Sequence, residues 1–140
     1  MNENMTCNQR RLFVLAANLS LLALLMVFEV SYRSAGWNVT MNTLIAANGL
    51  IFLFSFLMGY VRSGAWRFSH KSIEMLDERE MIVSSAVMRI AYAVFTILVL
   101  AVLLTFTLMD WQLDMVLVAT LILFAHLLPA SLIAWKKSLI

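Results

Sequence analysis

The sequence predicts an all-α, polytopic membrane protein in which four transmembrane helices form a single domain over residues 1–140. Of the 140 residues, 63% are hydrophobic and 13% are charged, whereas a soluble domain has about 45–50% apolar and about 25% charged residues. Four helices that each cross a bilayer with about 20 apolar residues would use nearly all of this excess. The apolar segments are continuous rather than alternating, so they favour helices over a β-barrel. This composition excludes a soluble domain and a large catalytic domain outside the membrane.

The first two spans are predicted at about residues 12–35 and 42–61. Residues 12–28 carry no charge, and a further turn with Glu29 and Arg33 can extend that helix. Because these two side chains stand four residues apart, we expect an ion pair that anchors the helix end at the membrane interface. Small multidrug exporters also use a glutamate in the first of four spans, but Glu29 lies too near the end of the span for that role. The second span is the shortest and ends near Tyr60, a residue typical of the headgroup level.

The third and fourth spans are predicted at about residues 82–109 and 113–135. Residues 81–109 are apolar apart from Arg89 and a few hydroxyl groups. Counting back about 20 residues from Met109 places the bilayer boundary near Ile90, so we expect Arg89 to snorkel to the interface. The fourth span contains His126 and Pro129.

The distribution of lysine and arginine predicts the orientation of the chain. Basic residues flank the spans almost entirely on one side, at Arg10, Arg11, Arg62, Arg67, Lys71, Arg79, Lys136 and Lys137. The opposite side has Arg33 together with Glu29, Asp110 and Asp114. The positive-inside rule therefore places both termini and the 62–80 loop in the cytoplasm.

The cytoplasmic loop 62–80 is predicted to lead directly into the third span. It has no helix breaker after Gly64, and Ser69 or Ser72 could cap a helix that runs over 73–109. Such a helix would be roughly 55 Å long and would extend into the cytoplasm. Its segment 73–88 carries apolar side chains among charged ones, so we expect it to pack against the surface of the lipid bilayer, a second copy or a membrane-protein partner. The predicted interface consists of Ile73, Leu76, Asp77, Glu78, Arg79, Glu80 and Met81.

Two motifs in this part of the chain resemble those of a known group. The run Leu76-Asp77-Glu78-Arg79-Glu80 precedes the third span, and Arg89-Ile90-Ala91-Tyr92 opens it. This order is similar to that of small four-span prokaryotic membrane proteins of unknown function, which carry an Asp-Glu-Arg-Glu run at the same place. The resemblance implies a bacterial or archaeal plasma membrane, and it implies no activity.

The same loop contains the candidate ligands for a metal ion. On a continuous helix His70, Glu74, Asp77 and Glu78 would share one face, as ligands of a divalent ion do. Basic residues close by in the sequence can neutralise these acids, so we interpret the face as solvated and salt-bridged, and we predict no metal site.

Among the polar residues in or near the predicted spans, four are candidates for a specific role: Asn18, Asn48, Arg89 and His126. Asparagines at such depths are typical partners in hydrogen bonds between helices. His126 precedes a proline by three residues, and we expect it to bond a hydroxyl or amide group of a neighbouring helix. Proton relay or haem ligation are the alternatives, although the second histidine, His70, lies in the loop.

No catalytic constellation or cofactor-binding motif is present, and the net charge of +2 is too small to indicate nucleic-acid binding. We therefore expect a non-enzymatic plasma-membrane subunit that acts through its cytoplasmic helix. The alternative is a small oligomeric transporter or channel whose path is lined by His126, Asn18 and Asn48. A redox subunit is a third possibility.

Overall fold

A computed structural model describes residues 5–135, and over this range the chain is helical and has no strand. In this part of the chain four helical segments are long and apolar enough to cross a membrane: Cys7–Ser34, Val39–Arg62, Glu78–Leu108 and Met115–Trp135. The predicted all-α class, with four helices long and apolar enough to cross a membrane, is therefore confirmed. The contacts of the chain fall into two units, the first ending at Ala65 and the second beginning at Trp66. That all four helices form one bundle stays a prediction.

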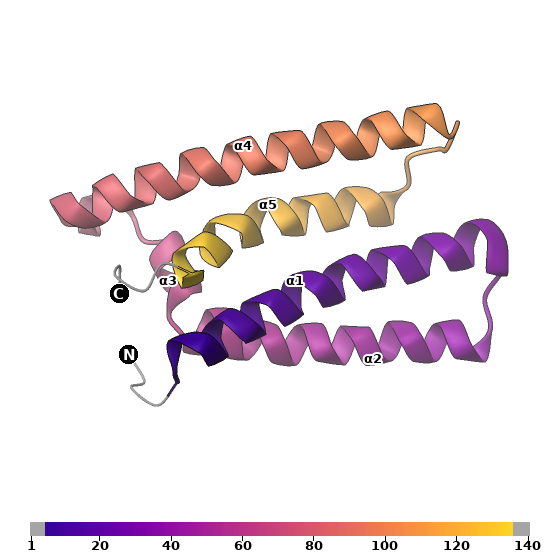
Figure 1. Ribbon diagram of the computed structural model, residues 1–140, viewed down its shortest axis with the longest axis horizontal. Coiled ribbons are helices and arrows are strands. Elements are labelled where there is room, and N and C mark those ends of the chain that lie inside the picture. The colour runs from indigo at the N-terminus through magenta and orange to yellow at the C-terminus, as the bar shows by residue number, and fades with distance from the viewer. Residues whose placement is uncertain (1–4, 136–140) are drawn as a thin grey trace. The chain divides into compact units, whose positions relative to one another are not determined.

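The first unit is an antiparallel pair of helices (Figure 1). Helix α1 (Cys7–Val30) starts at a capping box, in which Thr6 and Gln9 each bond the other's backbone N–H. It continues as the π-helical turn η1 (Ser31–Ala35), and the chain then turns at Gly36, whose φ of 69° suits glycine. Helix α2 (Val39–Phe56) follows and ends in a second π-helical turn, η2 (Leu57–Arg62).

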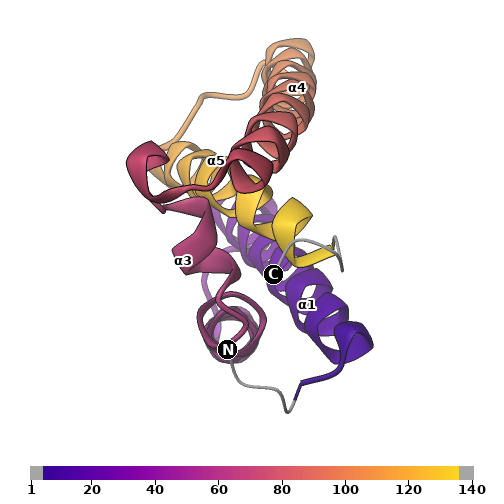
Figure 2. The same cartoon turned by 90° about the vertical axis from the view of Figure 1, so that its left-hand side faces the viewer.

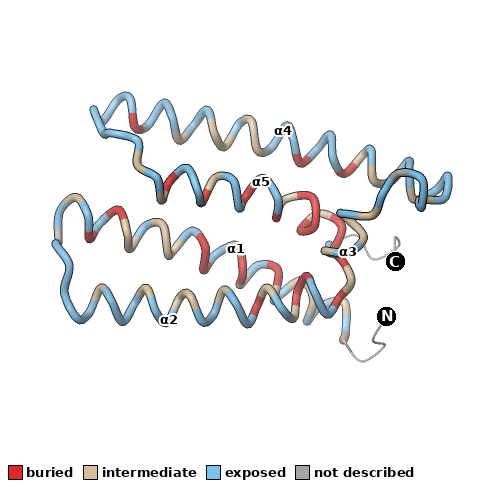
Figure 3. Tube along the Cα trace, turned by 180° about the vertical axis from the view of Figure 1, so that it is seen from behind, coloured by how far each residue is buried: buried red, intermediate tan, exposed pale blue. Residues whose placement is uncertain are grey.

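The two helices of this unit approach most closely at Gly59. A Cβ atom on Gly59 would lie 3.1 Å from the backbone nitrogen of Val14 and 3.2 Å from the carbonyl carbon of Phe13. Buried residues gather around this point, as the red segments of Figure 3 show for α1: Val14, Ala17 and Leu21 on α1, and Ser55 and Tyr60 on the facing helix. A small residue at the crossing thus lets the backbones meet, as in other membrane helix pairs.

The second unit contains two short and two long helices. The short helix α3 (Ala65–Ser69) begins at the boundary, directly after Gly64, and the 3₁₀ turn η3 (Ile73–Met75) follows it. Helix α4 (Glu78–Leu108) then packs antiparallel to α5 (Met115–Trp135), and the end-on view of Figure 2 also shows these two helices as neighbours. At 1.5 Å per residue, α4 is about 46 Å long.

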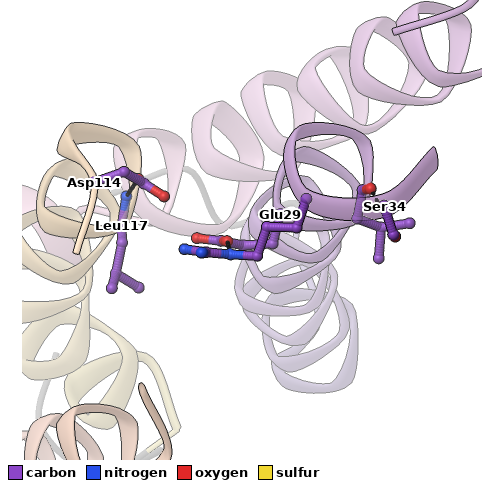
Figure 4. Close-up of polar contacts among 6 residues, drawn as sticks. Glu29, Ser34, Asp114 and Leu117 are labelled. Atoms are coloured by element: carbon purple, nitrogen blue, oxygen red, sulfur yellow. Dashed lines mark hydrogen bonds and ion pairs between the residues drawn. The ribbon is translucent and has the colours of Figure 1, made fainter. Parts of the chain in front are cut away.

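A tight turn joins α4 to α5. Asp110 adopts a φ of 54°, a left-handed conformation that aspartate tolerates better than most residues. Trp111 folds back so that its ring packs edge-on against Phe106, 5.5 Å away. Asp114 then accepts a hydrogen bond from the backbone N–H of Leu117 at 2.8 Å, which caps α5 (Figure 4).

The prediction that one helix begins at residue 73 is wrong. The cap is neither Ser69 nor Ser72 but Asp77, so α4 starts at Glu78 and the preceding residues form α3, η3 and turns. The physical reason is the Asp-x-x-Glu pattern of Asp77 and Glu80, which satisfies the first free N–H groups of the helix better than a lone serine does.

Candidate functional site

The candidate site is the segment between the second and third long helices. Its charged residues do not share one face of a helix. Asp77 accepts a hydrogen bond from the Glu80 N–H at 2.6 Å, and Glu80 accepts one from the Asp77 N–H at 3.3 Å. Lys71 reaches the same Glu80 carboxylate at 2.6 Å. Two of the predicted interface residues, Asp77 and Glu80, are therefore held in the start of α4.

The candidate metal ligands His70, Glu74, Asp77 and Glu78 do not converge. Within residues 5–135 no three histidine, cysteine, aspartate or glutamate side chains are close enough together to hold a metal ion. His70 packs its ring 4.2 Å from the ring of Trp66, and its Nδ1 lies 2.9 Å from the Trp66 carbonyl oxygen. The shared helical face that placed these four residues together is broken because the chain leaves α3 at Ser69 and starts α4 at Glu78.

The remaining members of the predicted interface lie on or beside the start of α4. Glu78, Arg79 and Met81 are exposed, and Leu76 is half-buried. The side chain of Ile73 lies outside the described residues. Exposed apolar side chains that the sequence did not single out add to this surface, namely Met75 and Ile82, which are 71% and 67% exposed. Polar groups that stabilise the helix thus stand beside apolar groups that water would solvate poorly.

The structure places Asn18 in a hydrogen bond between helices. Its Nδ2 donates to the hydroxyl of Tyr60 at 2.9 Å and to the Val14 carbonyl at 2.8 Å. Tyr60 is completely buried within the chain, while the headgroup level of its ring stays a prediction. The neighbouring small residue Gly59 could have indicated that Tyr60 is buried, because it lets α1 come near enough to cover the ring.

Asn48 bonds the Leu44 carbonyl of its own helix at 2.9 Å. It stands twelve residues before Tyr60, a distance of about 18 Å along the helix. Asn18 and Asn48 therefore lie at different depths of the first unit and do not line a common point. This separation gives no support to a polar path through that unit.

His126 is exposed on α5, and its Nδ1 lies 2.9 Å from the carbonyl oxygen of Ile122. That partner belongs to its own helix, one turn earlier, rather than to a hydroxyl or amide of another helix as we expected. Pro129 is buried within α5. Because proline has no N–H, the carbonyl of the residue four places earlier loses its helical donor. Arg89 is exposed on α4, as a snorkelling side chain requires.

Glu29 and Arg33 form an ion pair at the end of α1 (Figure 4). Aromatic rings stand beside it: Phe28 stacks on Tyr32 and meets Trp37 edge-on, with centroids 5.9 Å and 5.6 Å apart. Glu29 is only 8% exposed, so pairing with Arg33 compensates its charge. The cluster fits an anchor at a membrane interface, where aromatic rings collect.

Comparison of the chain with protein-family models, with characterised proteins and with solved structures finds no match.

Proposed function

We propose that the chain is a non-enzymatic, multi-pass subunit of a prokaryotic plasma membrane that self-associates or binds a membrane-protein partner through the start of its third long helix. Both termini and the 62–80 segment would then lie in the cytoplasm, as the positive-inside rule requires. The resemblance of the Leu76–Glu80 run to that of small prokaryotic membrane proteins supports the choice of membrane.

The observation that carries the proposal is the apolar surface around the start of α4. Met75, Met81, Ile82 and Met88 are exposed there, among charged residues that mark the aqueous side of the bilayer boundary. If the bilayer begins near Ile90, lipid does not cover the earlier residues of this group. Contact with another helix would remove them from water, and burial of each such side chain is worth about 1.5–3 kcal/mol.

The capping arrangement supports the same proposal. Asp77, Glu80 and Lys71 fix where α4 begins, so Met81 and Ile82 are presented on a formed helix rather than on a flexible loop. A preformed surface binds with a smaller loss of conformational entropy than a disordered one.

Substitution of Ile82 by aspartate tests the proposal. In membranes of the producing cell, we expect I82D to insert normally. The yield of crosslinked oligomer or copurified partner should fall by about tenfold or more, because the variant puts a charge where the proposed contact would bury apolar surface. The matched control is Ser72→Asp, which adds the same charge at an exposed polar position. Equal yields from I82D and the unsubstituted chain would refute the proposed surface.

A further inference from the structure

Three arginines gather at one end of the α1–α2 pair. Gly59 of η2 packs on Phe13 and Val14 of α1, and the two helices run antiparallel. Three residues before Phe13 is Arg10, and three residues after Gly59 is Arg62. Both arginines therefore lie one turn beyond the same crossing point, and Arg11 adds a third cation at this end.

Among the described residues of the same unit, no carboxylate neutralises this end. Over residues 5–65 the sole carboxylate is Glu29, which pairs with Arg33. Glu29 stands nineteen residues after Arg10, about 28 Å away along α1. The positive charge of the unit is thus concentrated where α1 begins and η2 ends.

Two of these guanidinium groups have few partners. The Nε of Arg10 is buried and donates no hydrogen bond to a residue within the described range. Among the described residues, the one hydrogen-bond acceptor of Arg62 is the sulfur of Met58, a weak acceptor on its own helix that lies 3.7 Å from Nη1. Ser63, by contrast, uses its hydroxyl to close the helix end at the Gly59 and Tyr60 carbonyls. The exposed guanidinium of Arg62 therefore remains available to an outside acceptor, and the buried Arg10 Nε lacks the acceptor that a buried donor normally has.

The start of α1 adds to the positive field. The dipole of a helix of this length favours an anion near its N-terminus. Arginine suits phosphate in particular, because its planar donor fork can make two parallel hydrogen bonds. A phosphate-bearing anion is thus the ligand chemistry that this end of the helix pair would recognise.

We propose that Arg10 and Arg62 bind the phosphate group of an anionic phospholipid at this end of the α1–α2 pair. The inference rests on the membrane location in the proposed function, but not on its contact surface at Ile82. Lipid is favoured over soluble phosphate because both arginines flank membrane-crossing helices and therefore stand at headgroup level. A bound headgroup would tie the ends of the two helices together.

The test is lipid binding by the purified, delipidated full-length chain in mild detergent, followed by native mass spectrometry and thermal unfolding. We expect phosphatidylglycerol to bind about tenfold or more tightly than phosphatidylcholine and to raise the Tm. The double variant Arg10→Gln with Arg62→Gln should reduce this preference to within about threefold, and Arg10→Lys with Arg62→Lys, which keeps the charge, should retain most of it. The control Arg79→Gln removes the same charge beside Glu78 and Glu80 and should change nothing.

Three results would overturn the inference. The unsubstituted chain could bind both lipids equally, the double glutamine variant could keep the preference, or inorganic phosphate alone could give the same arginine-dependent rise in Tm, which would identify a soluble ligand. The lipid-binding test is made in detergent and does not involve Ile82. A negative result there can therefore be told apart from a negative result of the crosslinking test.

Discussion

At the scale of single residues, Gly59 decides how closely α1 and α2 can pack. A methyl group at this position would meet backbone atoms of Phe13 and Val14 at 3.1–3.2 Å, and backbone atoms yield less easily than the end of a flexible side chain. We therefore expect Gly59→Ala to destabilise the folded chain by about 1–3 kcal/mol. Thermal unfolding in detergent, followed by circular dichroism, would measure the loss.

Gly49 provides the matched control on the same helix. A Cβ atom there has no heavy atom of the chain within 4 Å, so Gly49→Ala should be neutral or should stabilise the helix by up to about 1 kcal/mol. Equal losses from the two substitutions would show that the close approach at Gly59 contributes nothing specific.

The pair of Asn18 and Tyr60 shows what single residues reveal before a structure is known. An asparagine within an apolar run predicts a hydrogen bond between helices, because hydrocarbon offers the side chain no other partner. Its partner could not be predicted, since a tyrosine near a helix end suits the membrane interface equally well. Only the crossing at Gly59 decides that Tyr60 is buried.

At the scale of elements, the capping box at the start of α4 accounts for the acidic run. Asp77 and Glu80 satisfy each other's backbone N–H groups, and Glu80 also binds Lys71. We expect Asp77→Ala to cost about 0.5–2 kcal/mol and to fray the first turn of α4. Hydrogen exchange of the amides in residues 78–82 should accelerate, while the amides in the membrane-crossing part of α4 stay protected.

Two neighbouring substitutions separate capping from charge. Asp77→Asn retains a capping oxygen and should preserve most of the protection, whereas Glu78→Ala removes an exposed acid that makes no cap. Faster exchange in the Glu78 variant than in the Asp77→Ala variant would contradict the assigned role.

The lengths of the long helices were predictable, and their starts were not. Apolar runs mark the membrane-crossing cores because lipid imposes one simple requirement on every residue in them. Helices α1 and α4 nevertheless begin several residues outside those runs, directly after the caps Thr6 and Asp77, whose polar side chains satisfy the first backbone N–H groups. The same reason explains why the structure does not form the predicted helical face of His70, Glu74, Asp77 and Glu78. That face requires a helix that begins before the cap at Asp77.

At the scale of the whole molecule, the four membrane-crossing helices bury little of their surface within the described chain. On α4 the buried residues are Val87, Ala91 and Phe106, and most of its other apolar side chains are exposed. Water would make such a surface unfavourable, whereas lipid or a second helix solvates it well. The same exposure therefore agrees with a membrane location.

The orientation of the chain in the membrane is the broadest prediction, and the single cysteine makes it testable. We expect a membrane-impermeant maleimide to label Cys7 only after cells are lysed, because the positive-inside rule predicts a cytoplasmic location for the end of α1 that carries Arg10 and Arg11.

Replacements made in a Cys7→Ser background extend the measurement to the connections between the long helices. Ser72→Cys, between α2 and α4, should behave as Cys7 does, since basic residues surround it as well. Thr40→Cys and Gln112→Cys, at the other ends of the long helices, should be labelled in intact cells. All of these positions except the half-buried Cys7 are exposed. A position that is not labelled even after lysis is inaccessible to the maleimide and gives no information on orientation. The opposite result would be labelling of Cys7 and Ser72→Cys in intact cells, without labelling of Thr40→Cys and Gln112→Cys. It would show the inverted orientation, in which the charged start of α4 lies outside the cell.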